Sequence, residues 1–431
     1  MLIGRKKEVE LLQTVLRDEQ SHFIALYGRR RVGKTFLIRE TYGYRFTFQH
    51  AGLSEGTMKD QLFAFTSSLK DAGCKTTDSP KNWLEAFELL KDVVLIICAS
   101  ATSWMLSKVV HNKGGLYNRL TEQIHLQTFT LKECEEYVQA AGLVMNREQI
   151  LQYYMIFGGV PYYWGFLKKG LSLSQNLDAI LFAKDAPLAE EFKNLYASVF
   201  KHPEIYVKLI EALGTKRAGM TREDLIQASQ IINSGDLTLK LEELESCGFI
   251  RKYYAFGMKK KNAVYQLMDC FTLFYFQFLK DAPTDEHYWS NQINTPKVNN
   301  WMGLSFERVC MMHTDQIKQK LGISGVLTDI NSWYCKPDSD KGVFDSQIDM
   351  LIARKDQVIN LCEMKYSGSE YTITEKVERG IRNKIHDLTL LTGTKYAIYP
   401  TLITTYGLVP NSYSECVQSV VTLKDLFVEN L

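Results

Sequence analysis

A glycine-rich stretch near the N-terminus has the residue types and spacing of a phosphate-binding loop. It matches the pattern G-x-x-x-x-G-K-[ST] and consists of Gly28, Arg29, Arg30, Arg31, Val32, Gly33, Lys34 and Thr35. In such a loop the glycines let backbone N–H groups wrap around phosphate oxygens, and the N-terminus of the following helix attracts the negative charge. We expect Lys34 to reach the β- and γ-phosphates of ATP and Thr35 to hold Mg²⁺.

The residues on either side supply the context that this loop needs. The apolar run 22–27 predicts a strand before the loop, and residues 32–41 predict a helix after it. In a chain of 431 residues, a chance match to the pattern is on the order of one in a hundred at ordinary residue frequencies. The alternative is a glycine turn that binds no phosphate, and the strand–loop–helix order favours nucleotide binding.

Two predicted strands near the C-terminus carry acidic residues. The strands are predicted over 346–352 and 358–365, joined by a polar turn. Two registers are open: one places Asp349 opposite Cys362, and the other places it opposite Glu363. In the second register the two carboxylates lie side by side, which is unfavourable unless a cation lies between them.

Lys365 shares a face with Glu363 because strand side chains alternate. A helix predicted to begin at Trp301 adds a third acid, Glu307. Carboxylate oxygens favour Mg²⁺ or Mn²⁺, and a metal held by Glu307, Asp349 and Glu363 would polarise a phosphodiester and activate water. Lys365 would orient that water. We expect a nuclease site with Asp349, Glu363 and Lys365 as catalytic residues. The alternative is a hairpin with a surface ion pair, because E-x-K alone is common.

Composition excludes several classes of protein. Apolar residues make up 45% of the chain and charged residues 23%, which excludes a disordered or collagenous protein. Because the net charge is only +2, any nucleic-acid site must rest on local patches. The nine cysteines include no C-x-x-C pair, so we expect reduced thiols and no zinc site. The longest apolar run, 93–99, is too short to span a bilayer, and we expect a cytoplasmic protein without membrane contact.

The elements that must position these residues fall into several segments. In residues 1–130 strands alternate with helices, which predicts an α/β fold with a parallel sheet. The elements predicted there include strands 22–27, 44–49 and 93–98 and helices 58–71 and 83–90. The remaining segments are a helical lid at 131–200, a winged helix at 201–280, a polar linker at 281–300 and a second α/β domain at 301–431.

Three predicted helices followed by a hairpin indicate the winged helix. The helices cover 205–213, 221–228 and 236–247, and the hairpin covers 249–268 with Lys259–Lys261 at its tip. A winged helix can place its third helix in the DNA major groove and its wing on phosphates. Here the polar face of the third helix is mainly acidic and would repel DNA, so we favour an intramolecular role.

The chain resembles the prokaryotic ATPases of the AAA+/STAND superfamily that carry a winged helix and a C-terminal PD-(D/E)xK nuclease-like domain. Beyond the phosphate loop and the C-terminal acids, the residues carrying the resemblance are Ile3–Glu8, Ser100–Trp104, Tyr117–Leu120 and Gly158–Pro161. It implies a P-loop NTPase sheet with a helical lid, followed by a restriction-endonuclease-like α/β domain at 301–431.

The same resemblance implies further contacts with the nucleotide. Ser100–Ser103 would lie where a polar sensor faces the γ-phosphate, and Arg119 would sense phosphate. For Arg119 an ordinary surface arginine remains an equal alternative. Gly159 and Pro161 would pack against the base, the alternative being a plain turn that ends a helix.

One departure from this family concerns hydrolysis. The class needs a second strand ending in Asp, often Asp-Glu, to hold Mg²⁺ and orient water. No run of four apolar residues followed by an acid occurs between Thr35 and Val93, and Asp92 precedes its strand. Comparison with the family places a gap of about one βαβ unit, roughly 30 residues, near Leu90–Lys91. Either the protein lacks this unit or the present sequence omits it. We therefore expect ATP binding without hydrolysis.

Two functions remain open at this point. In the first, ATP binding gates the access of nucleic acid to a metal-dependent nuclease site. In the second, the protein is a non-enzymatic, nucleotide-dependent switch or DNA-binding regulator with an inactive nuclease fold. The intact acids Glu307, Asp349 and Glu363 favour the first, and the absent acidic strand favours the second. A homo-oligomer and a regulatory protein partner are both compatible with the sequence.

Overall fold

A computed structural model describes residues 2–18, 20–53, 56–75, 79–90, 94–100, 105, 109–110, 120–257, 263–283 and 285–429. The chain forms two compact units, residues 1–127 and residues 128–431. Within the described ranges, no helix has both the length and the apolar character needed to cross a membrane.

A parallel sheet forms the centre of the first unit. Its strands are β1 (Phe23–Tyr27), β2 (Leu95–Ala99) and β3 (Glu122–His125), in the order β2-β1-β3. Among the described residues, the helices with stated bounds in this unit are α1 (Lys6–Arg17), α2 (Lys34–Thr41), α3 (Met58–Asp71) and α4 (Trp83–Glu88). Leu12 of α1 and Leu37 of α2 are buried against Ile24 and Leu26 of β1. The predicted α/β fold with a parallel sheet is confirmed.

The strand predicted at 44–49 is wrong. This segment forms a turn and irregular chain after α2, because Gly43 and Tyr44 both have positive φ, 58° and 60°. The aromatic residues of the segment pack elsewhere: the Phe48 ring lies 5.3 Å from the Phe65 ring of α3. Phe48, which is part of the alternation that resembled a strand, therefore packs against the core formed by α3 and α4. Conversely, β3 was not predicted.

The N-terminal part of the second unit is helical. Its elements are α6 (Leu131–Ala140), α7 (Arg147–Phe157), α8 (Pro161–Trp164), α9 (Leu173–Leu177), a π-helical turn η2 (Asp178–Phe182) and α10 (Glu191–Ala197). Side chains of α7 are buried along most of their length, including Tyr153, Tyr154 and Phe157. The helical pattern predicted for 131–200 is present.

Three helices and a small antiparallel sheet follow. They are α11 (Pro203–Gly214), β4 (Met220–Thr221), α12 (Arg222–Ser229), α13 (Gly235–Ser246), β5 (Ile250–Tyr254) and β6 (Ala263–Leu267), with strand order β4-β6-β5. Thr221 caps α12 by accepting a hydrogen bond from the Asp224 N–H. The order of elements is the one predicted, but the lysines expected at the hairpin tip, 259–261, lie outside the described residues.

The segment predicted as a linker is packed into the fold. After α14 (Cys270–Phe274) and the π-helical turn η3 (Tyr275–Leu279), it holds α15 (Tyr288–Gln292) and the first turn of α16 (Pro296–Met312). Tyr288 and Trp289 are buried, and the Asp178 carboxylate accepts a hydrogen bond of 2.8 Å from the Trp289 N–H. The helix that carries Glu307 thus begins earlier than the sequence predicts.

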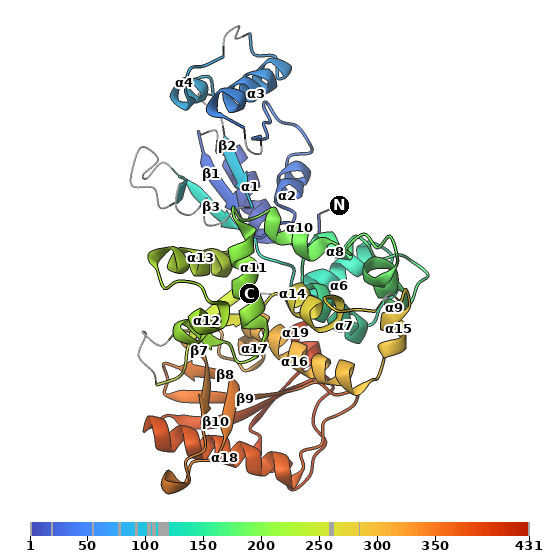
Figure 1. Ribbon diagram of the computed structural model, residues 1–431, viewed down its shortest axis with the longest axis vertical. Coiled ribbons are helices and arrows are strands. Elements are labelled where there is room, and N and C mark those ends of the chain that lie inside the picture. The colour runs from blue at the N-terminus through green and yellow to red at the C-terminus, as the bar shows by residue number, and fades with distance from the viewer. Residues whose placement is uncertain are drawn as a thin grey trace. The chain divides into compact units, whose positions relative to one another are not determined.

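A mixed five-stranded sheet ends the chain, in the order β11-β10-β9-β8-β7. Its elements are α17 (Thr314–Lys320), β7 (Thr328–Cys335), η4 (Ser339–Lys341), β8 (Ser346–Arg354), β9 (Val358–Lys365), α18 (Glu375–Thr392), β10 (Ala397–Thr404), η5 (Ser414–Cys416), β11 (Ser419–Thr422) and α19 (Leu423–Leu426). Strands β7, β8 and β9 are antiparallel, whereas β9, β10 and β11 are parallel. Helix α16 packs on β9 and α18 on β8 (Figure 1).

Candidate functional site

The phosphate loop of the first unit joins β1 to α2 as predicted. Gly33 begins α2 with a φ of 89°, and Gly28 has a φ of 145°. A Cβ atom at position 28 would lie 2.3 Å from the backbone oxygen of Leu126, which follows β3. Only glycine fits there, because the loop backbone passes directly over the end of a neighbouring strand.

Lys34 lies across its own loop. Its Nζ atom donates hydrogen bonds to the backbone oxygens of Gly28 at 2.9 Å and Arg29 at 2.7 Å, and the residue is buried. The carboxyl ends of β2 and β3 bring Cys98 and His125 near this ammonium group. Burial, reinforced by the positive charge of Lys34, lowers the pKa of His125. This end of the sheet therefore has a positive potential suited to an anion such as a nucleotide phosphate.

The described strands contribute no carboxylate to this edge of the sheet. They end at Tyr27, Ala99 and His125, and β2 pairs with β1 alone among the described strands. The predicted phosphate sensor Arg119 and the polar residues 101–103 lie outside the described residues.

The glycine turn after α7 closes tightly on the start of the second unit. The Phe129 N–H donates to the Gly159 oxygen at 2.6 Å, and a Cβ atom at position 159 would lie 1.8 Å from the Phe129 oxygen. Pro161 begins α8. The turn thus has a packing role within its own unit, and the contact of Gly159 and Pro161 with a nucleotide stays a prediction.

The hairpin of the C-terminal sheet adopts the second of the two registers. Ala353 pairs with Ile359 and Met350 with Cys362, so Asp349 and Glu363 occupy facing positions one step further along. Glu363 contacts two lysines: Lys365 Nζ lies 2.7 Å from its Oε1 atom, and Lys384 Nζ lies 2.6 Å from its Oε2 atom. Burial alone would raise the pKa of Glu363, but the charges of Lys384 and Lys365 lower it.

Glu307 lies on α16 and contacts a base from another part of the chain. Its Oε2 atom meets the guanidinium of Arg217, which comes from the turn between α11 and β4. Burial and then the charge of Asp349 raise the pKa of Glu307, and Arg217 opposes them. Glu307 also interacts electrostatically with Lys365. The structure therefore brings the four predicted residues into one neighbourhood.

Two further arginines surround the acids. Arg251 of β5 donates to Gln266 at 2.6 Å and to Ser332 Oγ at 3.0 Å, and Ser332 Oγ in turn donates to the Asp349 backbone oxygen at 2.5 Å. Burial, followed by the nearby Arg308, lowers the pKa of Arg251 to about 10. Arg308 of α16 is itself buried. These contacts join the 201–280 segment to the C-terminal sheet.

The carboxylates do not form a ready metal site in this arrangement. No group of three or more His, Cys, Asp or Glu side chains that could hold a metal ion occurs in the part of the chain that the structure describes. The reason is that Glu307 faces Arg217 while both oxygens of Glu363 face lysines. The expected ligand set Glu307, Asp349 and Glu363 is thus not preformed, and its metal-binding role stays a prediction.

His313, which follows the last residue of α16, is a packed residue. It is fully buried, its Nε2 atom accepts from the Leu131 N–H at 3.0 Å, and its Nδ1 atom lies 2.8 Å from the Val309 oxygen. Burial lowers its pKa to about 4. The neutral ring therefore ties α6 to α16, and both of its nitrogens are used.

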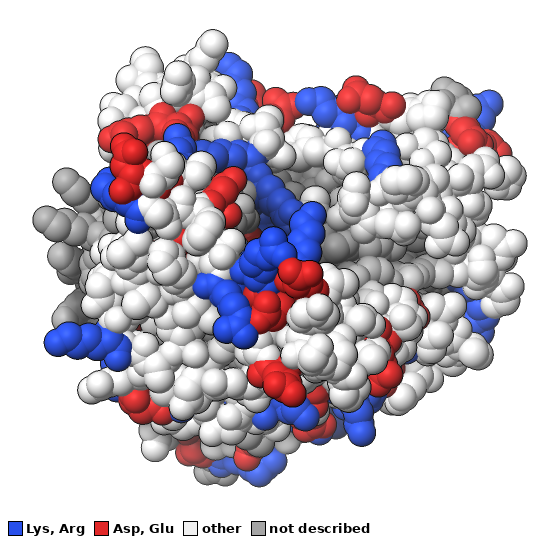
Figure 2. All heavy atoms as spheres, turned by 90° about the horizontal axis from the view of Figure 1, so that it is seen from below, with Lys and Arg blue, Asp and Glu red and all other residues white. Residues whose placement is uncertain are grey.

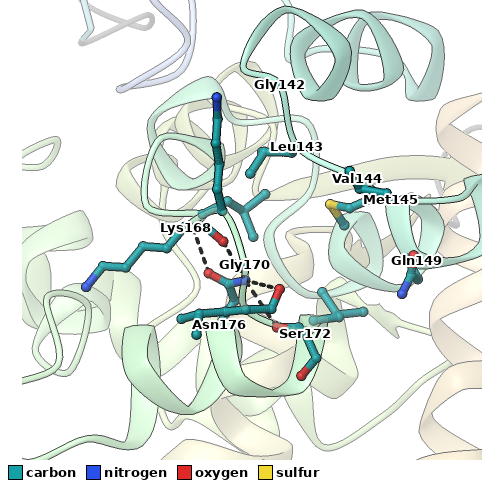
Figure 3. A pocket seen from close by; sticks show the side chains of 13 residues that line it. Gly142, Leu143, Val144, Met145, Gln149, Lys168, Gly170, Ser172 and Asn176 are labelled. Carbon is teal, nitrogen blue, oxygen red and sulfur yellow. Dashed lines mark hydrogen bonds between the residues drawn. The ribbon is translucent and has the colours of Figure 1, made fainter.

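A separate pocket of about 230 Å³ lies beside the loops that follow α6 and α8 (Figure 3). Asn176 lines it, but its amide is used within the loop: Oδ1 accepts from the Lys168 N–H at 2.7 Å, and Nδ2 donates to the oxygens of Lys168, Leu171 and Ser172. This side chain holds the loop closed. Lys168 and Lys169 line the pocket, but its described lining includes no carboxylate or histidine that could act with them, so the pocket is not a candidate active site.

The charged surface seen from below carries both signs. Figure 2 shows Lys and Arg atoms gathered in a diagonal band with Asp and Glu atoms beside it. On the outer helix α18, Arg379 pairs with Glu375 and Arg382 with Glu378. The exposed arginines of this helix are therefore largely neutralised, and a strong nucleic-acid footprint is not evident on it.

The chain is similar in sequence to proteins of one archaeon. No family model matches the chain. An uncharacterised protein of Methanocaldococcus jannaschii is 24% identical over 421 residues, covering 89% of this chain and 92% of that protein. An uncharacterised ATP-binding protein of the same organism is 48% identical over 40 residues, which span 9% of this chain and 68% of that protein.

Two solved structures are also similar. A Walker-type ATPase of Pyrococcus abyssi matches 64% of this chain and 96% of its own, with 14% identity and a TM-score of 0.41. A STAND protein of Pyrococcus horikoshii with a tetratricopeptide repeat sensor matches 75% of this chain and 56% of its own, with 14% identity and a TM-score of 0.26.

Sequence reasoning missed the basic residues that reach the C-terminal acids from other elements of the chain. Arg217 and Arg251 come from the segment predicted as a winged helix, and Lys384 comes from α18. None of them belongs to a local motif. Lys384 could have been recognised from the sequence, because this lysine lies among apolar positions of a helix that is expected to cover the sheet.

Proposed function

We propose that this protein binds ATP with Mg²⁺ at Gly28–Thr35 and acts as a nucleotide-dependent switch that does not hydrolyse ATP. One observation carries the proposal. The loop has the glycine conformations and the buried lysine that phosphate binding needs, while the described strands bring no carboxylate to the edge where a hydrolytic acid would lie. The name of the 48% identical relative supports the choice of ATP.

Calorimetric titration with ATP and Mg²⁺ tests the binding step. Lys34→Ala should weaken binding at least about tenfold, because a charge-assisted contact with phosphate is worth about 1.5–3 kcal/mol. Lys59→Ala, an exposed lysine on α3, is the matched control and should bind as the unchanged protein does. A single-turnover assay on the same samples should show no Mg²⁺-dependent hydrolysis. Clear turnover would refute the switch.

A second candidate function is metal-dependent cleavage of nucleic acid at the C-terminal site. The hairpin register favours it, because Asp349 and Glu363 occupy facing positions and Glu307 and Lys365 lie within electrostatic reach. For this proposal Asp349 and Glu363 would be the ligands of Mg²⁺ or Mn²⁺ together with Glu307. The metal would supply Lewis-acid activation when bound.

A cleavage assay distinguishes this candidate from an inactive nuclease fold. Single- and double-stranded DNA and RNA are incubated with Mg²⁺ or Mn²⁺, with and without ATP. Asp349→Asn should abolish cleavage, whereas Asp356→Asn, in the exposed hairpin turn where it pairs with Arg354, should leave it unchanged. Absence of cleavage by the unchanged protein under every condition would leave the C-terminal part as a binding or regulatory module.

For the segment 201–280 we propose an intramolecular role. The acidic residues of α13 are used inside the segment: Glu243 accepts from the Tyr206 hydroxyl, and Glu245 accepts from the Lys252 N–H at 3.3 Å. Two of its arginines, Arg217 and Arg251, contact the C-terminal part. Glu242 and Glu245 of α13 are exposed and would repel phosphate, while the two arginines face the C-terminal part. A winged helix of this kind is poorly suited to grip DNA through α13.

A further inference from the structure

A histidine that sequence reasoning did not single out lies beside the phosphate loop. His125 is the last residue of β3 and pairs in register with Tyr27, the last residue of β1, which directly precedes Gly28. The next residue, Leu126, is the one over whose backbone the loop passes. His125 therefore lies at the carboxyl end of the sheet, next to the backbone that would wrap a phosphate.

Two contacts fix the ring of His125. One of its faces stacks on the Tyr27 ring, with centroids 4.9 Å apart and planes at 17°. The amide nitrogen of Gln127 lies 2.9 Å from His125 Nδ1. Because an amide nitrogen only donates, Nδ1 is the acceptor and the proton of the neutral ring is on Nε2. Nε2 has no hydrogen-bond partner among the described residues, so it is the ring nitrogen left to contact a ligand.

The charged groups around this ring are cations. Lys34 of α2 acts on it electrostatically, and burial followed by this charge keeps the pKa of His125 below its ordinary value. The loop adds Arg29–Arg31, and Arg5, which precedes α1, donates to the Gln127 backbone oxygen at 2.7 Å. No carboxylate is among the described groups that shift the pKa of His125. The ring is therefore a neutral donor in a positive surrounding, which suits an anion.

A bound polyphosphate would change the charge balance at His125. The other titratable side chains at this edge of the sheet, Tyr27 of β1 and Cys98 of β2, are neutral at pH 7 because burial raises the pKa of both. The phosphate charge would offset the charge of Lys34 and would favour the protonated ring. Binding of the anion should therefore raise the pKa of His125.

We propose that His125 is a further phosphate contact of the nucleotide site and that ATP binding is coupled to the uptake of a proton by its ring. This rests on the proposed function, because the coupling needs a nucleotide at Gly28–Thr35. Without nucleotide the ring is neutral at pH 7, and with phosphate beside it the proton is held more tightly. ATP affinity therefore rises as the pH falls through the interval between the two pKa values of His125, and His125 adds no pH dependence above both.

Calorimetric titration of the full-length protein with ATP and Mg²⁺ between about pH 8 and about pH 5.5, in two buffers of different ionisation enthalpy, measures affinity and proton uptake together. His125→Gln keeps a neutral donor but takes up no proton. It should match the unchanged protein at about pH 8 and bind about tenfold more weakly at about pH 5.5, the size expected for a charge-assisted contact with phosphate. Its proton uptake should also be smaller. Protonation of ATP itself is common to both proteins and cancels in the comparison.

Matched variants separate this coupling from other effects of pH. His22→Gln is the control, because His22 lies before β1 at the opposite end of the sheet and pairs with Asp18 at 2.8 Å, and it should keep the pH dependence of the unchanged protein. Equal pH dependence and proton uptake in the unchanged protein and in His125→Gln, with weaker binding in Lys34→Ala, would overturn the His125 contact but keep the nucleotide site. No ATP binding by the unchanged protein at any pH tested would overturn both.

Discussion

The ammonium group of Lys384 lies 2.6 Å from the Oε2 atom of Glu363, although 21 residues separate them in the chain. Glu363 is on β9 and Lys384 is on α18, the helix that packs on the same sheet. Together with Lys365, this contact gives both oxygens of a half-buried carboxylate a cationic partner. The lysine supplied by α18 thus joins Lys365 in lowering the pKa of Glu363, which burial alone would raise.

Replacing Lys384 should therefore destabilise the second unit. In Lys384→Met, Glu363 loses one of its two counter-charges while remaining shielded from water. We expect the free energy of unfolding to fall by about 1–2 kcal/mol. Urea unfolding followed by circular dichroism measures it. Lys376→Met, at an exposed position on the same helix, should change stability by less than about 0.5 kcal/mol. Equal effects of the two variants would show that the Glu363 contact contributes nothing.

Gly28→Ala should disrupt the phosphate loop more than positive φ alone explains. The added methyl group would lie 2.3 Å from the Leu126 oxygen, in addition to the strain of a φ of 145°. Gly43→Ala is the control, because Gly43 also has positive φ but has open space around it. We expect Gly43→Ala to lower the free energy of unfolding by about 1 kcal/mol. Gly28→Ala should lower it by at least about 2 kcal/mol more and should also abolish ATP binding. Thermal unfolding and calorimetric titration report the two effects.

His313 should make stability fall in mild acid. Its pKa is about 4 in the folded protein, against about 6.5 in an unfolded chain. Between pH 6.5 and pH 4 the unfolded chain therefore binds a proton that the folded protein excludes, so protons favour unfolding. This contribution reaches at most about 3 kcal/mol near pH 4 and is absent above pH 7.

The difference between the unchanged protein and His313→Gln isolates that contribution, because the other titrating groups are common to both. The stability advantage of the unchanged protein, measured by urea midpoints, should be largest near pH 7 and should shrink as the pH falls to 4. An advantage that stays constant over this range would mean that His313 takes up its proton in the folded state as readily as in the unfolded chain.

Glu148 of α7 should couple the helical part of the second unit to the C-terminal sheet. Its carboxylate accepts hydrogen bonds from the hydroxyls of Tyr366 and Tyr406, and Gln152 also contacts Tyr366 at 3.1 Å. Burial, with Glu148 contributing, raises the pKa of Tyr366 to about 12. Glu148→Ala should lower the free energy of unfolding by about 1–3 kcal/mol, because two tyrosine hydroxyls lose a charged acceptor.

The spectroscopic consequence of Glu148→Ala is separate from its effect on stability. Tyr366 should then ionise at lower pH in an ultraviolet titration, since a neighbouring negative charge has been removed. Glu190→Ala, which breaks the exposed pair with Lys193, is the control and should move neither stability nor the titration appreciably. A Tyr366 titration that does not change in Glu148→Ala would contradict the coupling.

Local patterns were sufficient to predict much of this molecule. Strand β1, the loop Gly28–Thr35 and α2 follow from a short apolar run, a glycine spacing and a helical stripe, all of which act between neighbours in the chain. The hairpin of β8 and β9 was likewise predictable from alternation and a polar turn. At 44–49 the local pattern predicted a strand, but the structure instead packs the Phe48 ring against Phe65 of α3.

What the tertiary structure alone decided is the electrostatic state of the C-terminal acids. The sequence by itself determined that Glu307, Asp349, Glu363 and Lys365 exist at suitable spacings, but it left the hairpin register open. Pairing of Ala353 with Ile359 settled that register. Arg217, Arg251 and Lys384 then reached the same acids from elements remote in sequence. Charges act through space and depend on burial, so their effect on these carboxylates is set by packing and cannot be read from spacing along the chain.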